Sequence, residues 1–506
     1  MLPHPDPALA AALAADLRAA GYSSRGLREA WGETADDAIA RGLRGPALRV
    51  LGERRDPLAV LARLLGLGVE QGRDLVDTAL PATGSAGLAA LGLADLDGRV
   101  VRAAALVRPQ AFADAHGEGE WWIASDLDEA ALGGPLPEDH VLGVGGASLT
   151  LAALQVGGPA ATGLDVGTGC GIQALRMRRD VDRVVATDVS QRALRFTRLN
   201  ALLNGVDGIE TRHGSLFAPV RHERFDRIAT NPPFVITPRV ADVPAYEYRD
   251  GGREGDALVA DVVRGAGEHL APGGVAQLLG NWETRGGRDG LERVREWVDQ
   301  SSIPLDAWVV ERETLDPLAY AELWIRDGGT LPGTPAYARL VDAWLDDFAG
   351  REVTAIGFGY ILLRRPADDR PTLSRFERVA GSGEGPLGAH VAAALAAHDR
   401  LQRTDDVGLA ASGFVVSPDV TEARHHRPGE ETPTIIELRQ GGGFGRALSV
   451  DPALAAVVGA SDGDLPLGAL VDAVADLLDV DAAALRADVF PRIRELVFTG
   501  FLRFAD

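Results

Sequence analysis

The chain of 506 residues contains no lysine and only one cysteine, Cys170. A single cysteine cannot form an internal disulfide bond, and it excludes a metal cluster built on cysteine ligands. The ten histidines are scattered along the chain, and even the neighbouring His425 and His426 lack the spacing of metal ligands. We therefore expect neither a disulfide nor a metal site.

Long apolar runs are missing as well. No stretch approaches the ~20 apolar residues that a membrane-spanning helix needs. The first residues, Met1 to Asp6, lack the basic segment that opens a secretory signal. Hydrophobic residues make up 46% of the chain and the mean hydropathy is +0.00, as in soluble globular proteins. We expect a cytoplasmic protein.

The chain also lacks an excess of positive charge. Its formal net charge is -22 at pH 7, and all of its basic side chains are arginine. The N-terminal, central and C-terminal parts each carry more acidic residues than arginines. Proteins that neutralise many phosphates show a strong basic excess. The composition therefore disfavours a nucleic-acid substrate. It does not exclude a local stripe of basic residues.

The length predicts several domains, because one hydrophobic core rarely serves 506 residues. Helical patterns fill residues 8–80, and an Asp-Gly turn at Gly98 between apolar flanks indicates a hairpin. Helices followed by a hairpin predict an α+β, winged-helix-like N-terminal domain over 1–115. An acidic segment over 116–150, with Trp121-Trp122, is interpreted as a bridge whose tryptophans dock on a neighbouring domain.

Residues 151–366 alternate strand and helix signals, which predicts a mostly parallel sheet with helices on both faces. The fold class is therefore α/β, with a Rossmann-like doubly wound sheet in this domain. The expected strands are Gly163–Val166, Val184–Val189, Arg227–Thr230, Val275–Leu279, Ala307–Val310 and Ile356–Leu363. The aromatic residues between Tyr320 and Phe348 are expected to be core.

The composition changes after residue 366. A linker is expected over 367–386, where Gly381 to Pro386 is rich in glycine. Residues 387–506 contain helical patterns at 467–478 and 482–497 and end in a strand-like segment, which again suggests a winged-helix-like domain. Acidic residues outnumber arginines around these helices, so we expect this domain to dock protein rather than DNA.

A glycine-rich loop, Asp165-Val166-Gly167-Thr168-Gly169-Cys170-Gly171, follows the first expected strand of the central domain. Glycines allow the backbone to turn tightly and to approach a ligand closely. The dinucleotide-binding fingerprint would need glycine at position 172, which is Ile172. The Gly-x-Gly-x-Gly pattern instead suits a nucleoside with an amino-acid tail. Cys170 is interpreted as a small buried residue of the loop, not as a nucleophile.

Two further elements accompany this loop. Asp188 ends the next expected strand, where a carboxylate can accept both ribose hydroxyls in charge-assisted hydrogen bonds; helix capping is the alternative. Thr230-Asn231-Pro232-Pro233-Phe234 follows an apolar strand, some sixty residues after the glycine loop. Such a tetrapeptide alone has little specificity, but its position behind the loop makes it informative.

The two motifs together resemble the class I S-adenosylmethionine-dependent methyltransferases of the Asn-Pro-Pro-aromatic branch, in particular the HemK-type enzymes. The resemblance covers roughly residues 140–365 and implies S-adenosyl-L-methionine as cofactor. It implies that Gly167, Gly169 and Gly171 form the cofactor loop and that Asp165 faces the cofactor's ammonium group. At the position where the family usually has an aspartate for adenine, this chain has Ser215, followed by Leu216.

The resemblance also implies how methyl transfer is catalysed. The Asn231 side-chain oxygen and the Pro232 carbonyl would accept hydrogen bonds from both N–H groups of a planar nitrogen. Phe234 would lie against the planar substrate. The residues 246–255 are expected to form a flap over the entrance.

The favoured substrate is the side-chain amide of a protein glutamine, because the acidity of the chain speaks against nucleic acid. The alternative is RNA, methylated at adenine N6 or guanine N2. Release-factor enzymes usually carry tyrosine where this chain has Phe234, and phenylalanine is common among the rRNA enzymes. The arginines between Arg176 and Arg198 would then form a local basic stripe. A second alternative is a non-catalytic methyltransferase-like scaffold. Ser215, in place of the family's aspartate, mildly favours this alternative.

Overall fold

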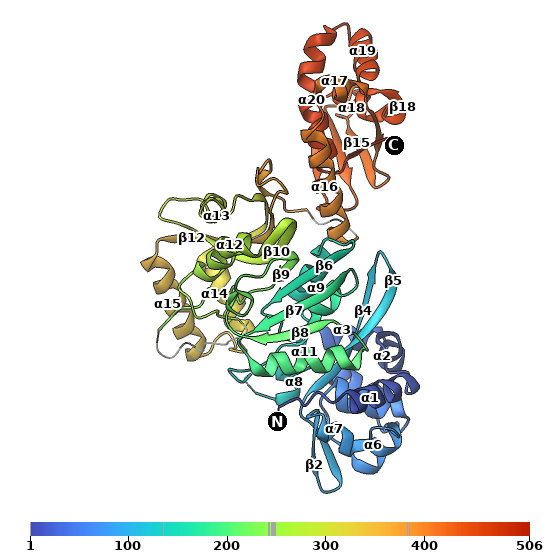
Figure 1. Cartoon of the computed structure of the whole chain (residues 1–506), viewed down its shortest axis with the longest axis vertical. Helices are drawn as coiled ribbons and strands as arrows, with labels where there is room; N and C mark the ends of the chain where they lie inside the picture. Colours follow the sequence, from blue (N-terminus) through green and yellow to red (C-terminus); the bar gives the residue numbers. More distant parts are fainter. Residues whose placement is uncertain are drawn as a thin grey trace. The chain divides into compact units, whose positions relative to one another are not determined.

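A computed structural model describes residues 2–134, 136–240, 243, 249–381, 383 and 385–505 (Figure 1). The chain divides into two compact units. The first unit comprises Met1–Ala152 and Gly158–Glu377, and the second comprises Ala153–Gly157 and Arg378–Asp506. Across the described residues, no helix combines the length and apolar character that crossing a membrane requires.

The first unit is built on an eight-stranded sheet with the order β13-β11-β12-β10-β9-β6-β7-β8. Its strands are β6 (Ala160–Val166), β7 (Val181–Asp188), β8 (Ile209–His213), β9 (Phe225–Thr230), β10 (Leu270–Arg285), β11 (Asp306–Leu315), β12 (Val353–Arg364) and β13 (Ser374–Arg378). Strands β6 to β10 are mutually parallel, and β12 runs antiparallel to both of its neighbours. The predicted Rossmann-like, doubly wound α/β domain is confirmed.

Helices cover both faces of this sheet. They are α10 (Ile172–Met177), α11 (Gln191–Leu203), α12 (Ala257–His269), α13 (Gly290–Asp299), α14 (Pro317–Asp327) and α15 (Pro335–Gly350), with the short 3₁₀ turn η2 (Ala218–Val220). The apolar sides of α12 and α13 share one core cluster with the sheet, whereas α10 and α11 belong to another. Helix α11 begins where the Ser190 hydroxyl accepts a hydrogen bond from the Ala193 amide, and Gly205 follows its end with φ +63°.

The N-terminal part consists of helices followed by short strands. Its elements are α1 (Pro7–Ala19), α2 (Ser24–Trp31), α3 (Glu33–Ala40), α4 (Gly45–Leu51), α5 (Pro57–Leu61), the π-helical turn η1 (Ala62–Gly66), β1 (Gln71–Gly72), α6 (Arg73–Ala79), α7 (Gly84–Ala90), β2 (Ala94–Asp97), β3 (Val100–Ala103), β4 (Leu106–Asp114), β5 (Gly117–Ser125), α8 (Glu129–Leu132) and α9 (Gly146–Leu154). The hairpin predicted at Gly98 is confirmed by the antiparallel pair β2–β3. The winged-helix assignment stays a prediction.

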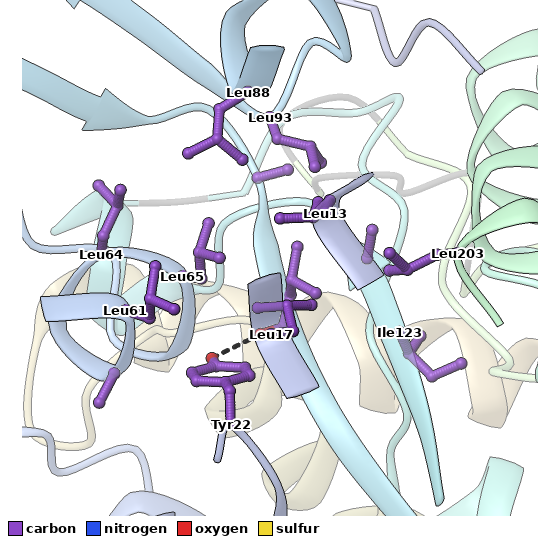
Figure 2. Packing of buried hydrophobic residues seen from close by; sticks show 14 of the residues in the cluster. Leu13, Leu17, Tyr22, Leu61, Leu64, Leu65, Leu88, Leu93, Ile123 and Leu203 are labelled. Atoms are coloured by element: carbon purple, nitrogen blue, oxygen red, sulfur yellow. Dashed lines mark hydrogen bonds between the residues drawn. The ribbon is translucent and has the colours of Figure 1, made fainter. Parts of the chain in front are cut away.

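One hydrophobic core joins the N-terminal part to the sheet domain. Figure 2 shows Leu13 and Leu17 of α1 among leucines of the N-terminal helices, with Ile123 of β5 and Leu203 of α11 in the same cluster. Trp122 adds polar contacts, because its Nε1 donates to the Tyr22 carbonyl at 2.7 Å and its amide donates to Asn204 Oδ1 at 2.9 Å. The N-terminal helices and α11 therefore pack as parts of a single unit.

The second unit contains α16 (Leu387–Gln402), α17 (Asp406–Ala411), β14 (Gly413–Val416), β15 (Val420–His425), β16 (Ile435–Gln440), β17 (Ala447–Val450), α18 (Pro452–Gly459), β18 (Asp462–Pro466), α19 (Leu467–Leu478), α20 (Ala482–Phe498) and β19 (Leu502–Phe504). Strand β14 lies between β18 and β19, and β15, β16 and β17 form a separate sheet. The terminal strand and both predicted helices are present. Their winged-helix character again stays a prediction.

Two of the expected boundaries differ from the structure. The division at 115/116 falls inside the β4–β5 hairpin, and the expected linker 367–386 contains β13, a strand at the edge of the large sheet. The expected strands also omitted β8, which is only five residues long. Composition could not reveal these features, because a short strand is defined by pairing with residues that are distant in sequence.

Candidate active site

The sheet places the two motifs beside one another. Strands β6 and β9 are parallel neighbours, and Val166 is paired directly with Thr230. The Thr230 hydroxyl donates a hydrogen bond to the Val166 carbonyl at 2.8 Å. The glycine loop and the Asn-Pro-Pro-Phe segment therefore leave the sheet at adjacent points. The strand order reverses between β6 and β9, which is where open α/β sheets bind ligands.

The backbone conformation of the glycine loop requires glycine at three positions. Gly167, Gly169 and Gly171 have φ values of +71°, +54° and +88°, in the left-handed region that other residues rarely adopt. A Cβ at Gly171 would also lie 3.0 Å from the Thr197 side chain. The Thr197 hydroxyl donates to the Gly169 carbonyl at 3.0 Å, so helix α11 packs directly against the loop.

Asp165 lies beneath this loop. Its Oδ2 accepts hydrogen bonds from the Thr168 hydroxyl at 2.6 Å and from the Ala174 amide at 3.0 Å. Its Oδ1 is buried, and no described residue donates to it. Burial raises the pKa of Asp165 to about 7, and nearby Asp188 adds to the shift. The carboxylate therefore ties the loop to the start of α10.

Substitution of Asp165 should change how stability depends on pH. The folded-state pKa lies above the ordinary value of 3.8, so the wild-type protein loses unfolding free energy as the pH rises from about 4 to about 7. Asp165→Asn keeps an acceptor oxygen but does not titrate. We expect this variant to gain up to several kcal/mol relative to wild type across that interval, at about 1.4 kcal/mol per pKa unit.

Denaturant unfolding at a series of pH values measures this difference. Asp226→Asn is a suitable control, because Asp226 lies at the opposite end of the sheet, where it accepts from the Ala161 and Thr162 amides. Parallel pH profiles for wild type and Asp165→Asn would show that the Asp165 carboxyl titrates normally.

Asp188 connects the loop to the end of β7. Its Oδ2 accepts from the Gly169 amide at 2.9 Å, and its Oδ1 accepts from the Ser190 amide at 2.8 Å. Ser190, not Asp188, caps helix α11. Asp188 therefore does not cap the helix. It accepts a hydrogen bond from the glycine loop instead. Asp188 also lines the cavity described below.

The Asn-Pro-Pro-Phe segment presents an acceptor without a donor. The Asn231 Oδ1 atom is buried, and no described residue donates a hydrogen bond to it. A buried polar atom without a partner costs about 1–3 kcal/mol, so such atoms call for an explanation. A ligand N–H group at this position would satisfy Asn231.

Several residues that sequence reasoning missed hold this segment in place. The Tyr320 hydroxyl accepts hydrogen bonds from the Ile236 amide at 3.0 Å and from Asn281 Nδ2 at 2.8 Å. The Val235 amide donates to the Arg249 carbonyl at 3.0 Å. Tyr320 is completely buried among Trp344 and other aromatic residues, which confirms that the aromatics of this region are core. No local signal connects positions so far apart in the chain.

A cavity of about 730 Å³ lies between the two motifs. Its walls include the predicted site residues Gly167, Gly169, Asp188, Ser215, Leu216, Asn231 and Pro232. Ser215 is exposed on the cavity wall, and Leu216 adopts a left-handed φ of +48°. The structure therefore gathers predicted residues from four separate segments of the sequence around one space.

Three predicted site residues do not line this cavity. Asp165 lies beneath the loop, and Gly171 packs against Thr197. The Phe234 ring packs edge-on against Trp324, with ring centroids 6.4 Å apart and an interplanar angle of 71°. Its expected contact with a planar substrate stays a prediction. Packing on α14 removes the apolar ring from water more completely than an open cavity would.

The loop that follows the motif approaches it closely. Gly251 has φ +47°, and a Cβ there would lie 2.8 Å from the Pro233 carbonyl oxygen and 2.5 Å from Leu258 Cδ2. Thr237 donates a hydrogen bond to Asp250 Oδ1, which secures the loop from the other side. Of the expected flap 246–255, residues 246–248 lie outside the described residues.

Cys170 and the arginines of this region have structural roles. Cys170 is buried, as expected, and burial raises the pKa of its thiol to about 11. The arginines expected as a basic stripe are Arg176, Arg178, Arg179, Arg192, Arg195 and Arg198. The first four pair with the carboxylates Asp114, Asp207 and Asp126. The last two donate to the Pro3 carbonyl and to the Thr211 hydroxyl.

Comparison with known families agrees with the two motifs. Residues 145–294, which contain both, match the family described as "Methyltransferase small domain". The flanking parts match two families described as domains of unknown function, DUF7059 over residues 19–104 and DUF7782 over residues 394–504. The resemblance inferred from the motifs is therefore confirmed for the central region, and extra domains flank it.

Curated relatives share the same region. A "Ribosomal protein uL3 glutamine methyltransferase" from Bradyrhizobium diazoefficiens is 38% identical over 121 residues, which cover 22% of this chain and 38% of that protein. A "Release factor glutamine methyltransferase" from Geobacter sulfurreducens is 34% identical over 131 residues, covering 24% and 46%. One from Cereibacter sphaeroides is 38% identical over 127 residues, covering 23% and 45%. The chain spans less than half the length of these relatives.

Among solved structures, a ribosomal protein L11 methylase from Lactobacillus delbrueckii subsp. bulgaricus aligns with a TM-score of 0.23 and 23% identity, over 33% of this chain and 69% of that chain. A likeness this low adds nothing to what the strand order shows.

Proposed function

We propose that this protein is an S-adenosylmethionine-dependent N-methyltransferase and that its methyl acceptor is the side-chain amide of a protein glutamine. The observation that carries the proposal is Asn231, which lines a cavity of about 730 Å³ and whose buried Oδ1 has no donor among the described residues. A primary amide brings the N–H groups that this atom lacks.

The chemistry of an amide explains the need for such acceptors. The nitrogen lone pair is delocalised into the carbonyl group, so the nitrogen is a poor nucleophile. When bound, S-adenosylmethionine supplies an electrophilic methyl group on its sulfonium sulfur. Asn231 Oδ1 and the Pro232 carbonyl oxygen would accept the two amide N–H groups, orient the nitrogen and raise its electron density. Positioning and electrostatics of this kind need no covalent intermediate.

The cavity walls fit the cofactor. Asp188 offers carboxylate lone pairs for two ribose hydroxyls, and the bare backbone of Gly167 and Gly169 permits close approach of the amino-acid tail. Asp165 lies beneath the loop and holds it in place. It would therefore position the loop backbone that binds the cofactor's ammonium group. Leu216 and Ser215 would flank the adenine.

The relatives support the choice of substrate. Their names specify glutamine in a release factor or in ribosomal protein uL3. The arginines of the expected basic stripe are engaged with carboxylates, a carbonyl and a hydroxyl, so the stripe gives no support to the RNA alternative. We also infer a cytoplasmic location, where translation takes place, and we propose that the acidic C-terminal domain docks protein.

The proposal is tested by incubating the protein with methyl-labelled S-adenosylmethionine and cell extract, with the Asn231→Ala variant as control. We expect label in protein that protease removes and ribonuclease does not, with methylglutamine found by mass spectrometry. Label in RNA would establish the RNA alternative. Absence of labelling, together with absence of cofactor binding in isothermal titration, would establish the scaffold.

Ser215 offers a test of the cofactor's orientation. If adenine lies over Ser215, Ser215→Asp places a carboxylate near the adenine amino group, and the exposed position leaves room for the larger side chain. We expect the Kd for S-adenosylmethionine to fall about 10-fold, as a charge-assisted hydrogen bond replaces a neutral one. Ser215→Asn, which is similar in size but uncharged, is the control. Weaker binding by a folded Ser215→Asp protein would place the adenine elsewhere.

A further inference from the structure

A second cavity adjoins the proposed active site. It has a volume of about 670 Å³, and it shares the wall residues His140, Leu142 and Gly143 with the cofactor cavity. Its other walls come from the β4–β5 hairpin, from α8 and from the end of α14. One short segment, which follows α8, therefore separates this space from the space that Asn231 lines.

The shared wall has an unusual apolar residue. Leu142 is 45% exposed although it lines both cavities. Leu106 and Ile123, in the floor of the second cavity, are by contrast almost completely buried. A chain segment that lay across Leu142 would remove its side chain from water and would reach both cavities at once.

The charges of the second cavity are mostly neutralised within the protein. Asp128 pairs with Arg108 at 2.6 Å, and Asp126 pairs with Arg192. Asp327, at the end of α14, lies 3.7 Å from Arg249. Each of these three carboxylates therefore has an arginine partner, although Arg249 also pairs with Asp250 at 3.2 Å.

Glu129 is the exception among the carboxylates of this wall. No described residue forms an ion pair with Glu129. Its neighbours Asp327 and Asp128 raise its pKa by more than Arg249 lowers it. Partial burial and these two carboxylates raise the pKa of Glu129. Arg41 also lines the cavity, but its Nε donates to the Asp37 carbonyl and it is not among the charges that act on Glu129. A cation brought by a ligand would relieve this repulsion.

We infer that the second cavity binds the stretch of substrate polypeptide next to the acceptor glutamine and that Glu129 selects a basic side chain in it. The inference rests on the proposed function, because it takes the glutamine amide to lie at Asn231. The negative field at Glu129 disfavours RNA phosphates at this wall.

The test uses the full-length protein saturated with S-adenosylhomocysteine and short fluorescent peptides with a single glutamine. The positions beside the glutamine carry arginine, alanine or glutamate in turn. Anisotropy titration gives the Kd of each peptide. We expect wild type to bind the best arginine peptide at least about 10-fold more tightly than its glutamate counterpart, and Glu129→Arg to reverse this preference. Methyl transfer to the same peptides should follow the same order in kcat/KM.

Glu292→Arg is the matched control, because Glu292 is an exposed glutamate on α13 that lines neither cavity. It should keep the wild-type preference. All three proteins should bind S-adenosylhomocysteine with the same Kd within about twofold, since neither glutamate touches the cofactor cavity.

The inference is overturned if Glu129→Arg keeps the wild-type peptide preference, if no peptide binds, or if RNA competes with the peptides in wild type. Failure of the proposed function has a different signature. In that case S-adenosylhomocysteine does not bind to any of the proteins, or Asn231→Ala still methylates the substrate protein in cell extract.

Discussion

Asn231→Ala should abolish methyl transfer while it leaves cofactor binding intact. The substitution removes Asn231 Oδ1, a buried acceptor of a cavity-lining residue to which no described residue donates. Loss of a comparable hydrogen-bonding group in a transition state lowers kcat by about 10²–10³-fold. The Kd for S-adenosylmethionine should change by less than about twofold, because the side chain is assigned to the acceptor nitrogen and not to the cofactor.

The same substitution should not destabilise the protein. An unpaired buried acceptor costs about 1–3 kcal/mol, so its removal should leave the unfolding free energy unchanged or raise it. Asn204→Ala is the matched control: Asn204 Oδ1 accepts from the Trp122 amide at 2.9 Å, far from the cavity walls. That variant should lose stability and keep its kcat. A folded Asn231→Ala protein with more than a tenth of wild-type turnover would remove Asn231 from the mechanism.

Asp188→Ala should have the opposite profile. We expect the Kd for S-adenosylmethionine to rise about 10–100-fold, because a carboxylate that accepts ribose hydroxyls is lost. The hydrogen bonds from the Gly169 and Ser190 amides are lost as well, which should cost about 1–2 kcal/mol of stability. At saturating cofactor, methyl transfer should recover most of its rate. Isothermal titration and initial rates at several cofactor concentrations measure both effects.

Asp188→Asn separates the two roles of this residue. The amide keeps an acceptor oxygen for one loop amide but lacks the negative charge, so its Kd should lie between those of wild type and Asp188→Ala. If Asp188→Ala lost stability but bound the cofactor as tightly as wild type, Asp188 would only hold the glycine loop to β7.

Part of the candidate site was predictable because local chemistry dictates it. Gly167, Gly169 and Gly171 all have positive φ, and an alternating glycine pattern after a strand is a direct signal of such a loop. Asn231 was identified through the family resemblance of the Asn-Pro-Pro-aromatic segment, in which the two prolines cannot donate to a sheet and so end the strand. Helix α11 also follows local rules, because Ser190 caps its start and Gly205 follows its end with positive φ.

Other parts of the site depend on contacts between distant residues. Asp165 was expected to face the cofactor, yet the Thr168 hydroxyl and the Ala174 amide engage it beneath the loop. Phe234 was expected against the substrate, yet it packs on Trp324, ninety residues later in the chain. The sequence contains these residues but not the distances between them.

The sequence by itself determined the kind of sheet, the glycine loop and the acceptor motif, because backbone conformation and strand alternation follow from residues that are close in the chain. Only the tertiary structure decided which side chains reach the cavity and which support it. The support of Ile236 by Tyr320, the neutralisation of Arg176 and Arg179 by Asp114, and the second cavity beside Glu129 all join separate segments. The physical reason is that burial and ion pairing depend on distances in space, which the packing of helices on the sheet sets.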